Sequence, residues 1–141
     1  MGADRTTDGQ HAGTLSTVAR ALTAAAVLLS AVVHLDLWAQ GMSSVAIVGP
    51  AFLLNAVGGL GLALAVLLWR HWLPLLGSIG FGVATLGAFV MSVTVGLLGV
   101  HESWDGVPQM LSAVSEIAAI VFAVVALAAE RRVRPRRPDR P

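Results

Sequence analysis

Four long apolar stretches, separated by short polar segments, dominate the pattern of the chain. They cover approximately residues 17–38, 45–69, 73–100 and 107–129. Each holds about 20 residues or more, the length at which an α-helix crosses a hydrocarbon core of roughly 30 Å. The stretches are continuously apolar and do not alternate, which favours helices over membrane strands. The pattern therefore predicts an all-α, polytopic membrane protein with four transmembrane helices.

The segments between these stretches are short, at residues 39–44, 70–72 and 101–106. Short connections join neighbouring helices that run in opposite directions, so we expect an antiparallel four-helix bundle. All four tryptophans fall at the expected helix ends, as an interfacial aromatic belt requires: Trp38, Trp69, Trp72 and Trp104. The chain then divides into an N-terminal tail (1–16), a transmembrane domain (17–129) and a C-terminal tail (130–141).

Charge is scarce and concentrated at the two ends of the chain. Hydrophobic residues make up 56% of the 141 positions and charged residues 12%, against roughly a quarter charged in an ordinary soluble domain. Of the 17 charged residues, 12 lie in the first 20 or the last 12 positions. Neither tail approaches the roughly 50 residues that a folded domain needs. We therefore expect neither a soluble globule nor an appended soluble catalytic domain.

The arginines predict the orientation in the membrane. All nine lie within the first 20 residues, in the second connection at Arg70, or in the C-terminal tail. Because positive charge is enriched on the cytoplasmic side, we expect both termini and the Arg70 connection inside. A cleaved signal peptide is the alternative for the first span, but Asp4 and Asp8 make a poor start for one. The use of Arg without Lys suggests GC-rich codons, hence a bacterial plasma membrane.

The C-terminal tail is rich in Arg and Pro, a composition that favours disorder over a packed core. Arginines close to a membrane attract anionic lipid headgroups at roughly 1 kcal/mol each. We assign this role to Arg131, Arg132, Arg134, Arg136 and Arg137. Nucleic acid is not an expected partner, because the tail has no aromatic residue on which bases could stack.

Small residues recur every three or four positions along the third span. They are Ser78, Gly82, Thr85, Ser92, Gly96 and Gly99. This spacing places them on one face of a helix, and such a face allows two helix backbones to approach closely. We predict that this seam packs against a neighbouring helix.

One acid lies deep inside a predicted span. Glu116 is nine residues past Val107, about 13 Å along a helix and close to mid-bilayer. An ionisable residue at that depth is a candidate functional site. His34, Asn55 and Ser112 are the polar residues that could join it in one pocket for a ligand, an ion or a proton. A purely structural role, with a protonated Glu116 hydrogen-bonded to Asn55 or to a backbone carbonyl to set the helix register, stays open.

The sequence gives little support to thiol, catalytic, metal or haem chemistry. Cysteine is absent, which removes disulfides, thiolate metal sites and thiol redox mechanisms. No catalytic triad, phosphate loop or pair of carboxylates can be assembled, so a non-enzymatic protein without a cofactor is favoured. A zinc or copper site would have to combine His34, His101 and Glu116. Haem would need two deep histidines on facing helices.

Two segments of the first hairpin carry a family resemblance. Residues 34–38 (HLDLW) and 49–59 (GPAFLLNAVGG) resemble small four-helix membrane proteins of actinobacterial type whose function is uncharacterised. The resemblance implies the four-span architecture and carries no activity.

Three functional classes remain at this point. The first is an accessory or interaction subunit, acting as a homo-oligomer or in a larger membrane complex, and the lack of catalytic groups favours it. The second is a proton-linked transporter or a binder of small ligands or ions that uses Glu116, His34 and Asn55. The third is a redox subunit holding a metal or haem.

Overall fold

The computed structural model describes residues 3–97, 101 and 106–133. Over these residues the chain is helical and contains no strand except an isolated bridge position. The elements in order are α1 (Ala3–Ala39), the short 3-10 helix η1 (Met42–Ser44), α2 (Val48–Leu68), α3 (Trp72–Thr94) and α4 (Val107–Val133). All four α-helices are long and apolar enough to cross a membrane. The predicted all-α fold with four candidate spans is thus confirmed.

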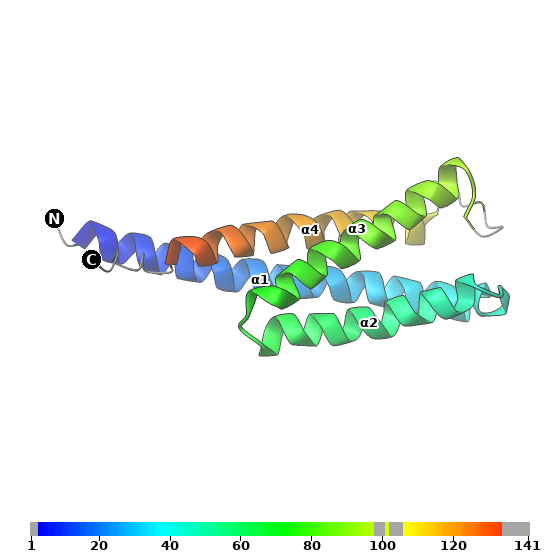
Figure 1. The fold of residues 1–141 in the computed structure, drawn as a ribbon, viewed down its shortest axis with the longest axis horizontal. Helices are drawn as coiled ribbons and strands as arrows, with labels where there is room; N and C mark the ends of the chain where they lie inside the picture. The colour runs from blue at the N-terminus through cyan, green and yellow to red at the C-terminus, as the bar shows by residue number, and fades with distance from the viewer. Residues whose placement is uncertain (1–2, 98–100, 102–105, 134–141) are drawn as a thin grey trace, which may run out of the picture.

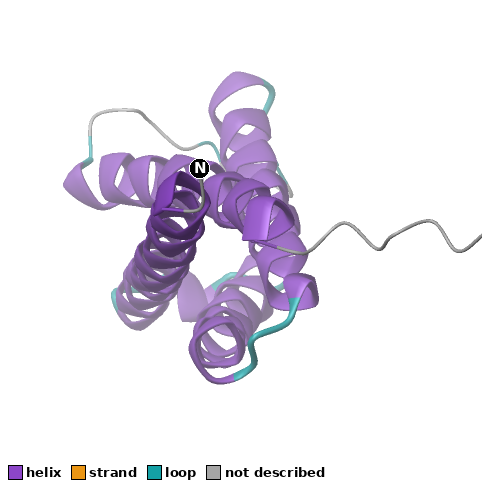
Figure 2. Ribbon diagram, turned by 90° about the vertical axis from the view of Figure 1, so that its left-hand side faces the viewer, coloured by secondary structure: helices purple, strands orange, loops and turns teal. Residues whose placement is uncertain are grey.

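The helices form an elongated cluster in which α1 and α4 lie side by side (Figure 1). Helix α2 packs mainly on α1, and α3 packs mainly on α4. From their shared turn, α2 and α3 diverge along the length of the molecule (Figure 1). The view along the long axis shows the helix axes inclined to one another (Figure 2). This divergence leaves the facing sides of α2 and α3 apart at the end of the molecule away from that turn.

Small side chains hold α1 and α4 together. The buried core contains Ala19, Ala24, Val27, Ala119, Ala123 and Ala126, joined by Ala63, Val66 and Leu75. Alanine at such positions lets helices approach closely and gain dispersion contacts. Large aliphatic side chains instead lie on the outside, with Leu54 74% exposed and Leu68 80% exposed. An apolar exterior over a core of small residues is what lipid as solvent favours.

Two helix ends differ from the predicted spans at the termini of the chain. Helix α1 begins at Ala3, so most of the expected tail (1–16) is helical. Helix α4 continues to Val133, so the prediction of disorder from Glu130 onward is wrong for its first four residues. Arginine is a good helix former, and Arg131 and Arg132 lie in the last turn, where the helix dipole favours positive charge.

Helix α3 ends at Thr94, short of the predicted end of its span at residue 100. Gly96 has φ +82° and lies beyond the helix, so the predicted helical seam stops before it; Gly99 lies outside the described residues. The Thr94 hydroxyl donates to Val90 O at 2.8 Å. The run from Ser92 to Gly96 is apolar enough for a span but is built from poor helix formers, which explains the early end.

The earlier residues of this seam lie along the side of α3 that faces α4 at Gly82. Ser78, Gly82 and Ser92 are buried and Thr85 is half-buried. A Cβ atom at Gly82 would lie 2.8 Å from Ile120 Cγ1 and 2.9 Å from Glu116 O. The backbones of α3 and α4 therefore touch at this glycine.

Candidate functional site

The four residues predicted to form a polar site line a single pocket of about 510 Å³. His34 comes from α1, Asn55 from α2, and Ser112 and Glu116 from α4. Helix α3 adds a wall that includes Phe81, Thr85, Phe89 and Ser92. The structure thus brings together side chains from all four helices.

The divergence of α2 and α3 creates this pocket. Its rim consists of exposed positions on both helices: Ala51, Leu54 and Gly58 on α2, and Ala84 on α3. Glu116, on α4, lies on its inner side, with only 1% of the side chain exposed. The pocket therefore runs from an apolar rim between two helices to a polar inner end.

Two serines orient the Glu116 carboxylate. Ser112 Oγ, one turn earlier on α4, donates to Glu116 Oε1 at 2.8 Å. Ser30 Oγ on α1 donates to the same oxygen at 3.4 Å. Both serines are buried, so these hydroxyls replace the water that an exposed carboxylate would bind.

The other carboxylate oxygen, Glu116 Oε2, is buried and has no hydrogen-bond partner among the described residues. Thr85 on α3 faces the carboxylate. A hydroxyl carries a single hydrogen, however, and Thr85 Oγ1 lies 2.5 Å from Phe81 O, to which it donates. An unpaired acceptor therefore remains at the inner end of the pocket.

His34 lies one turn after Ser30 on α1 and contacts that serine, not the carboxylate. Its Nδ1 lies 2.8 Å from Ser30 O. A carbonyl oxygen only accepts, so Nδ1 carries the hydrogen, and in the neutral ring Nε2 is the acceptor. The ring also contacts Phe52, with centroids 5.0 Å apart and planes tilted by 52°. Across the pocket, Asn55 Oδ1 is buried without a hydrogen-bond partner among the described residues.

The metal site considered from the sequence is not assembled. His101 lies beyond α3, is exposed, and does not line the pocket that contains His34 and Glu116. Within the described ranges, no group of three or more His, Cys, Asp and Glu side chains could hold a metal ion.

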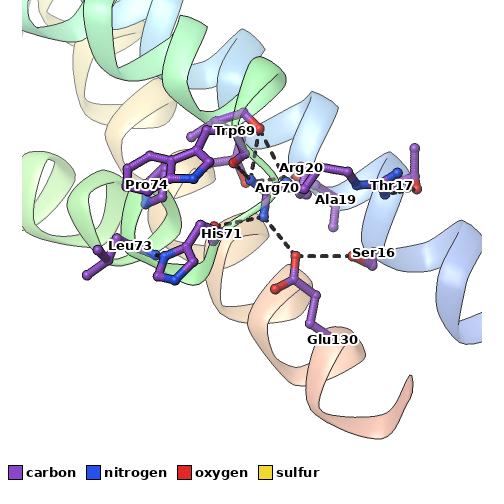
Figure 3. A network of polar contacts seen from close by, with 12 residues as sticks. Ser16, Thr17, Ala19, Arg20, Trp69, Arg70, His71, Leu73, Pro74 and Glu130 are labelled. Carbon is purple, nitrogen blue, oxygen red and sulfur yellow. Dashed lines mark hydrogen bonds and ion pairs between the residues drawn. The ribbon is translucent and has the colours of Figure 1, made fainter. Parts of the chain in front are cut away.

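A second polar cluster, absent from the sequence predictions, surrounds Arg20 (Figure 3). Only 4% of its side chain is exposed. Its guanidinium donates to Glu130 Oε1 at 2.7 Å and to Trp69 O at 2.8 Å. It also donates to Val66 O at 2.9 Å and to His71 O at 3.2 Å. Arg20 thereby donates to Val66 O in the last turn of α2, where intrahelical donors run out, and to two carbonyls of the following turn.

Of the arginines predicted to meet lipid headgroups, Arg131 and Arg132 are exposed in the last turn of α4. Arg134, Arg136 and Arg137 lie outside the described residues. Of the tryptophans, Trp69 and Trp72 are exposed at the turn between α2 and α3, and Trp38 is half-buried near the end of α1. Trp104 lies outside the described residues.

The fold and pocket define the class as an all-helical protein with four candidate membrane spans around an inner acid. Compared with known proteins, the chain matches no protein-family model, no curated protein and no solved structure.

Proposed function

We propose that the chain is a multi-pass protein of a bacterial plasma membrane, an antiparallel bundle with both termini in the cytoplasm. The orientation rests on the arginine distribution described above. The antiparallel arrangement is supported by two contacts between α1 and α4: Ser16 with Glu130, and Ser30 with Glu116. From Ser16 to Ser30 the residue number increases along α1, while the number of the partner on α4 decreases from Glu130 to Glu116. This is the pattern expected of two helices that run in opposite directions. In this orientation the pocket lies in the outer half of the bundle, and Arg131 and Arg132 meet anionic headgroups inside.

We infer that the protein binds a small ligand with an apolar body and a polar group in the pocket between α2 and α3. The observation that carries this proposal is the unpaired Glu116 Oε2 at the inner end of a pocket of about 510 Å³. Small-molecule sites typically measure roughly 300–1,000 Å³ and combine apolar walls with a few polar groups. A carboxylate whose only task is to set helix register needs no such space beside it.

An accessory role in a membrane complex is the second candidate. It is favoured by glycines on the outer faces of α2 and α3, where a Cβ atom would meet nothing within 4 Å: Gly58, Gly61, Gly80 and Gly87. Such positions allow a further helix, from a second copy or another protein, to approach closely. Ligand binding and assembly are compatible, because only Gly58 of these four lines the pocket.

Two α2 glycines provide a matched test of ligand binding. Both are exposed and open, but Gly58 lines the pocket and Gly61 does not. Purified protein in lipid nanodiscs would be photolabelled with a neutral phenylalkyl alcohol that carries a diazirine, and labelled residues would be mapped by mass spectrometry. We expect labels on the pocket walls of the native protein and of Gly61→Leu, and their loss in Gly58→Leu, which fills the space. Labelling spread evenly over lipid-facing residues in all three proteins would refute a ligand pocket.

A further inference from the structure

We propose that the ligand of this pocket is a protonated amine with an apolar body, whose N–H groups bind Glu116 and Asn55. This inference rests on the proposed binding function and adds the chemical class of the ligand. It follows from the charges, the free acceptors and the walls of the pocket, taken in turn.

The charge balance of the pocket favours a cation. Among the described residues that line the pocket, Glu116 is the only acid and none is an arginine. The buried Arg20 is engaged with Glu130 and with carbonyls of α2 and the following turn. His34 directs its Nδ1–H to Ser30 O and not to the carboxylate. A buried carboxylate is costly without a positive partner, so an ammonium ligand supplies what the described residues lack.

The unpaired hydrogen-bonding groups of the pocket favour a ligand that donates hydrogen bonds over one that carries only a charge. Glu116 Oε2 and Asn55 Oδ1 are both acceptors, and neither has a partner among the described residues. A primary ammonium brings three N–H donors, whereas an alcohol brings one and a quaternary ammonium none. Hydrogen bonds between charged groups are also the stronger ones. The pocket should therefore rank a primary amine above an alcohol or a quaternary ammonium of the same shape.

The walls suit the rest of such a ligand. Phe52, Phe81 and Phe89 line the pocket together with Leu37, Leu54 and Leu97. Aromatic faces attract cations by roughly 0.5–2 kcal/mol, and the aliphatic side chains accommodate an apolar body. The exposed rim at Leu54 and Gly58 opens between two helices, so an amphipathic amine can reach the pocket from the lipid side.

The test compares four ligands that share one apolar body. Phenylbutylamine, its trimethylammonium analogue, phenylbutanol and phenylbutyrate would compete with the diazirine photoprobe on native protein in nanodiscs. Concentrations are corrected for partition into empty nanodiscs. We expect the amine to protect the pocket at a concentration roughly tenfold or more below the alcohol and the quaternary analogue, with the carboxylate weakest.

The variant Glu116→Gln keeps the shape of the side chain and removes its charge. In it the advantage of the amine over the alcohol should fall to roughly twofold or less, while protection by the alcohol is retained. Glu130→Gln, the same change outside the pocket, should keep the advantage. Equal protection by amine and alcohol in the native protein would overturn the amine proposal and leave the ligand pocket standing. Absence of any specific labelling would instead refute the pocket itself, and this comparison needs no variant to fold.

Discussion

The Arg20 guanidinium lies 2.7 Å from the Glu130 carboxylate, joining α1 to α4 at the end of the bundle where α2 turns into α3. Arg20 is 4% exposed and Glu130 24%. The same guanidinium donates to three backbone carbonyls, at Val66, Trp69 and His71. One side chain therefore ties α1, α2, the α2–α3 turn and α4 together (Figure 3).

Arg20→Met should be among the most destabilising single changes in the chain. It removes the charged partner of Glu130 and one donor from each of three carbonyls, and removing one partner of a buried ion pair costs about 3–5 kcal/mol. Arg20→Lys should recover only part of this loss, because one ammonium cannot reproduce the planar set of donors. Equilibrium unfolding in mixed detergent micelles measures the difference.

Arg70 provides the control for that measurement. It is exposed, and its guanidinium donates to Thr17 Oγ1 at 3.0 Å. Arg70→Met should change the free energy of unfolding by less than about 1 kcal/mol. If Arg20→Met unfolds at the same denaturant concentration as Arg70→Met, the Arg20 cluster does not stabilise the bundle.

The contact between α3 and α4 can be tested at two glycines of one helix. A Cβ at Gly82 would lie 2.9 Å from Glu116 O, whereas at Gly80 it would meet nothing within 4 Å. Gly82→Ala should therefore lower the free energy of unfolding by about 1–3 kcal/mol, through overpacking against a backbone atom. Gly80→Ala should be neutral or raise it by up to about 1 kcal/mol, because alanine restricts the unfolded chain. A reversed order would mean that α3 turns a different face to α4.

The proposed orientation can be tested with single cysteines, since the natural chain has none. Ser43 is exposed in η1, and His11 is exposed near the start of α1. In intact cells, Ser43→Cys should react with a membrane-impermeant maleimide. His11→Cys should react only after the membrane is opened, because the proposed topology places both termini in the cytoplasm. The opposite labelling pattern would invert the topology.

The pocket residues could be predicted because each is a polar side chain at a known depth in a helix. Glu116 lies on α4 one turn from Ser112, and His34 lies near the C-terminal end of the first span. The lengths of the spans therefore predict similar depths in the membrane for these side chains. The aromatic walls could not be predicted in this way. Phe52, Phe81 and Phe89 look like ordinary apolar residues until the divergence of α2 and α3 exposes them to one space.

The Arg20 cluster was missed for a different reason. Three of its acceptors are backbone carbonyls, which leave no trace in residue identity or spacing. The sequence therefore identifies Arg20 as a topology signal but not as the centre of this cluster. The early end of α3 was missed because hydropathy continues past Thr94, while helix propensity, a weaker signal, decides where the helix stops.

The coupling between Ser112 and Glu116 offers a last prediction about the pocket. Ser112 Oγ donates to Glu116 Oε1 at 2.8 Å, and Ser30 Oγ donates to the same oxygen at 3.4 Å. Ser112→Ala therefore removes the shorter of these two hydrogen bonds and should cost about 1.5–3 kcal/mol of unfolding free energy. In a protein that already carries Glu116→Gln, Ser112→Ala should cost at least about 1 kcal/mol less than in the native protein, because the charged acceptor is already gone. Ser78→Ala, which removes a buried hydroxyl that bonds only Pro74 O at 2.9 Å, should be additive with Glu116→Gln. Additivity for both serines would show that Ser112 does not hold the carboxylate, and the inner end of the pocket would then need another explanation.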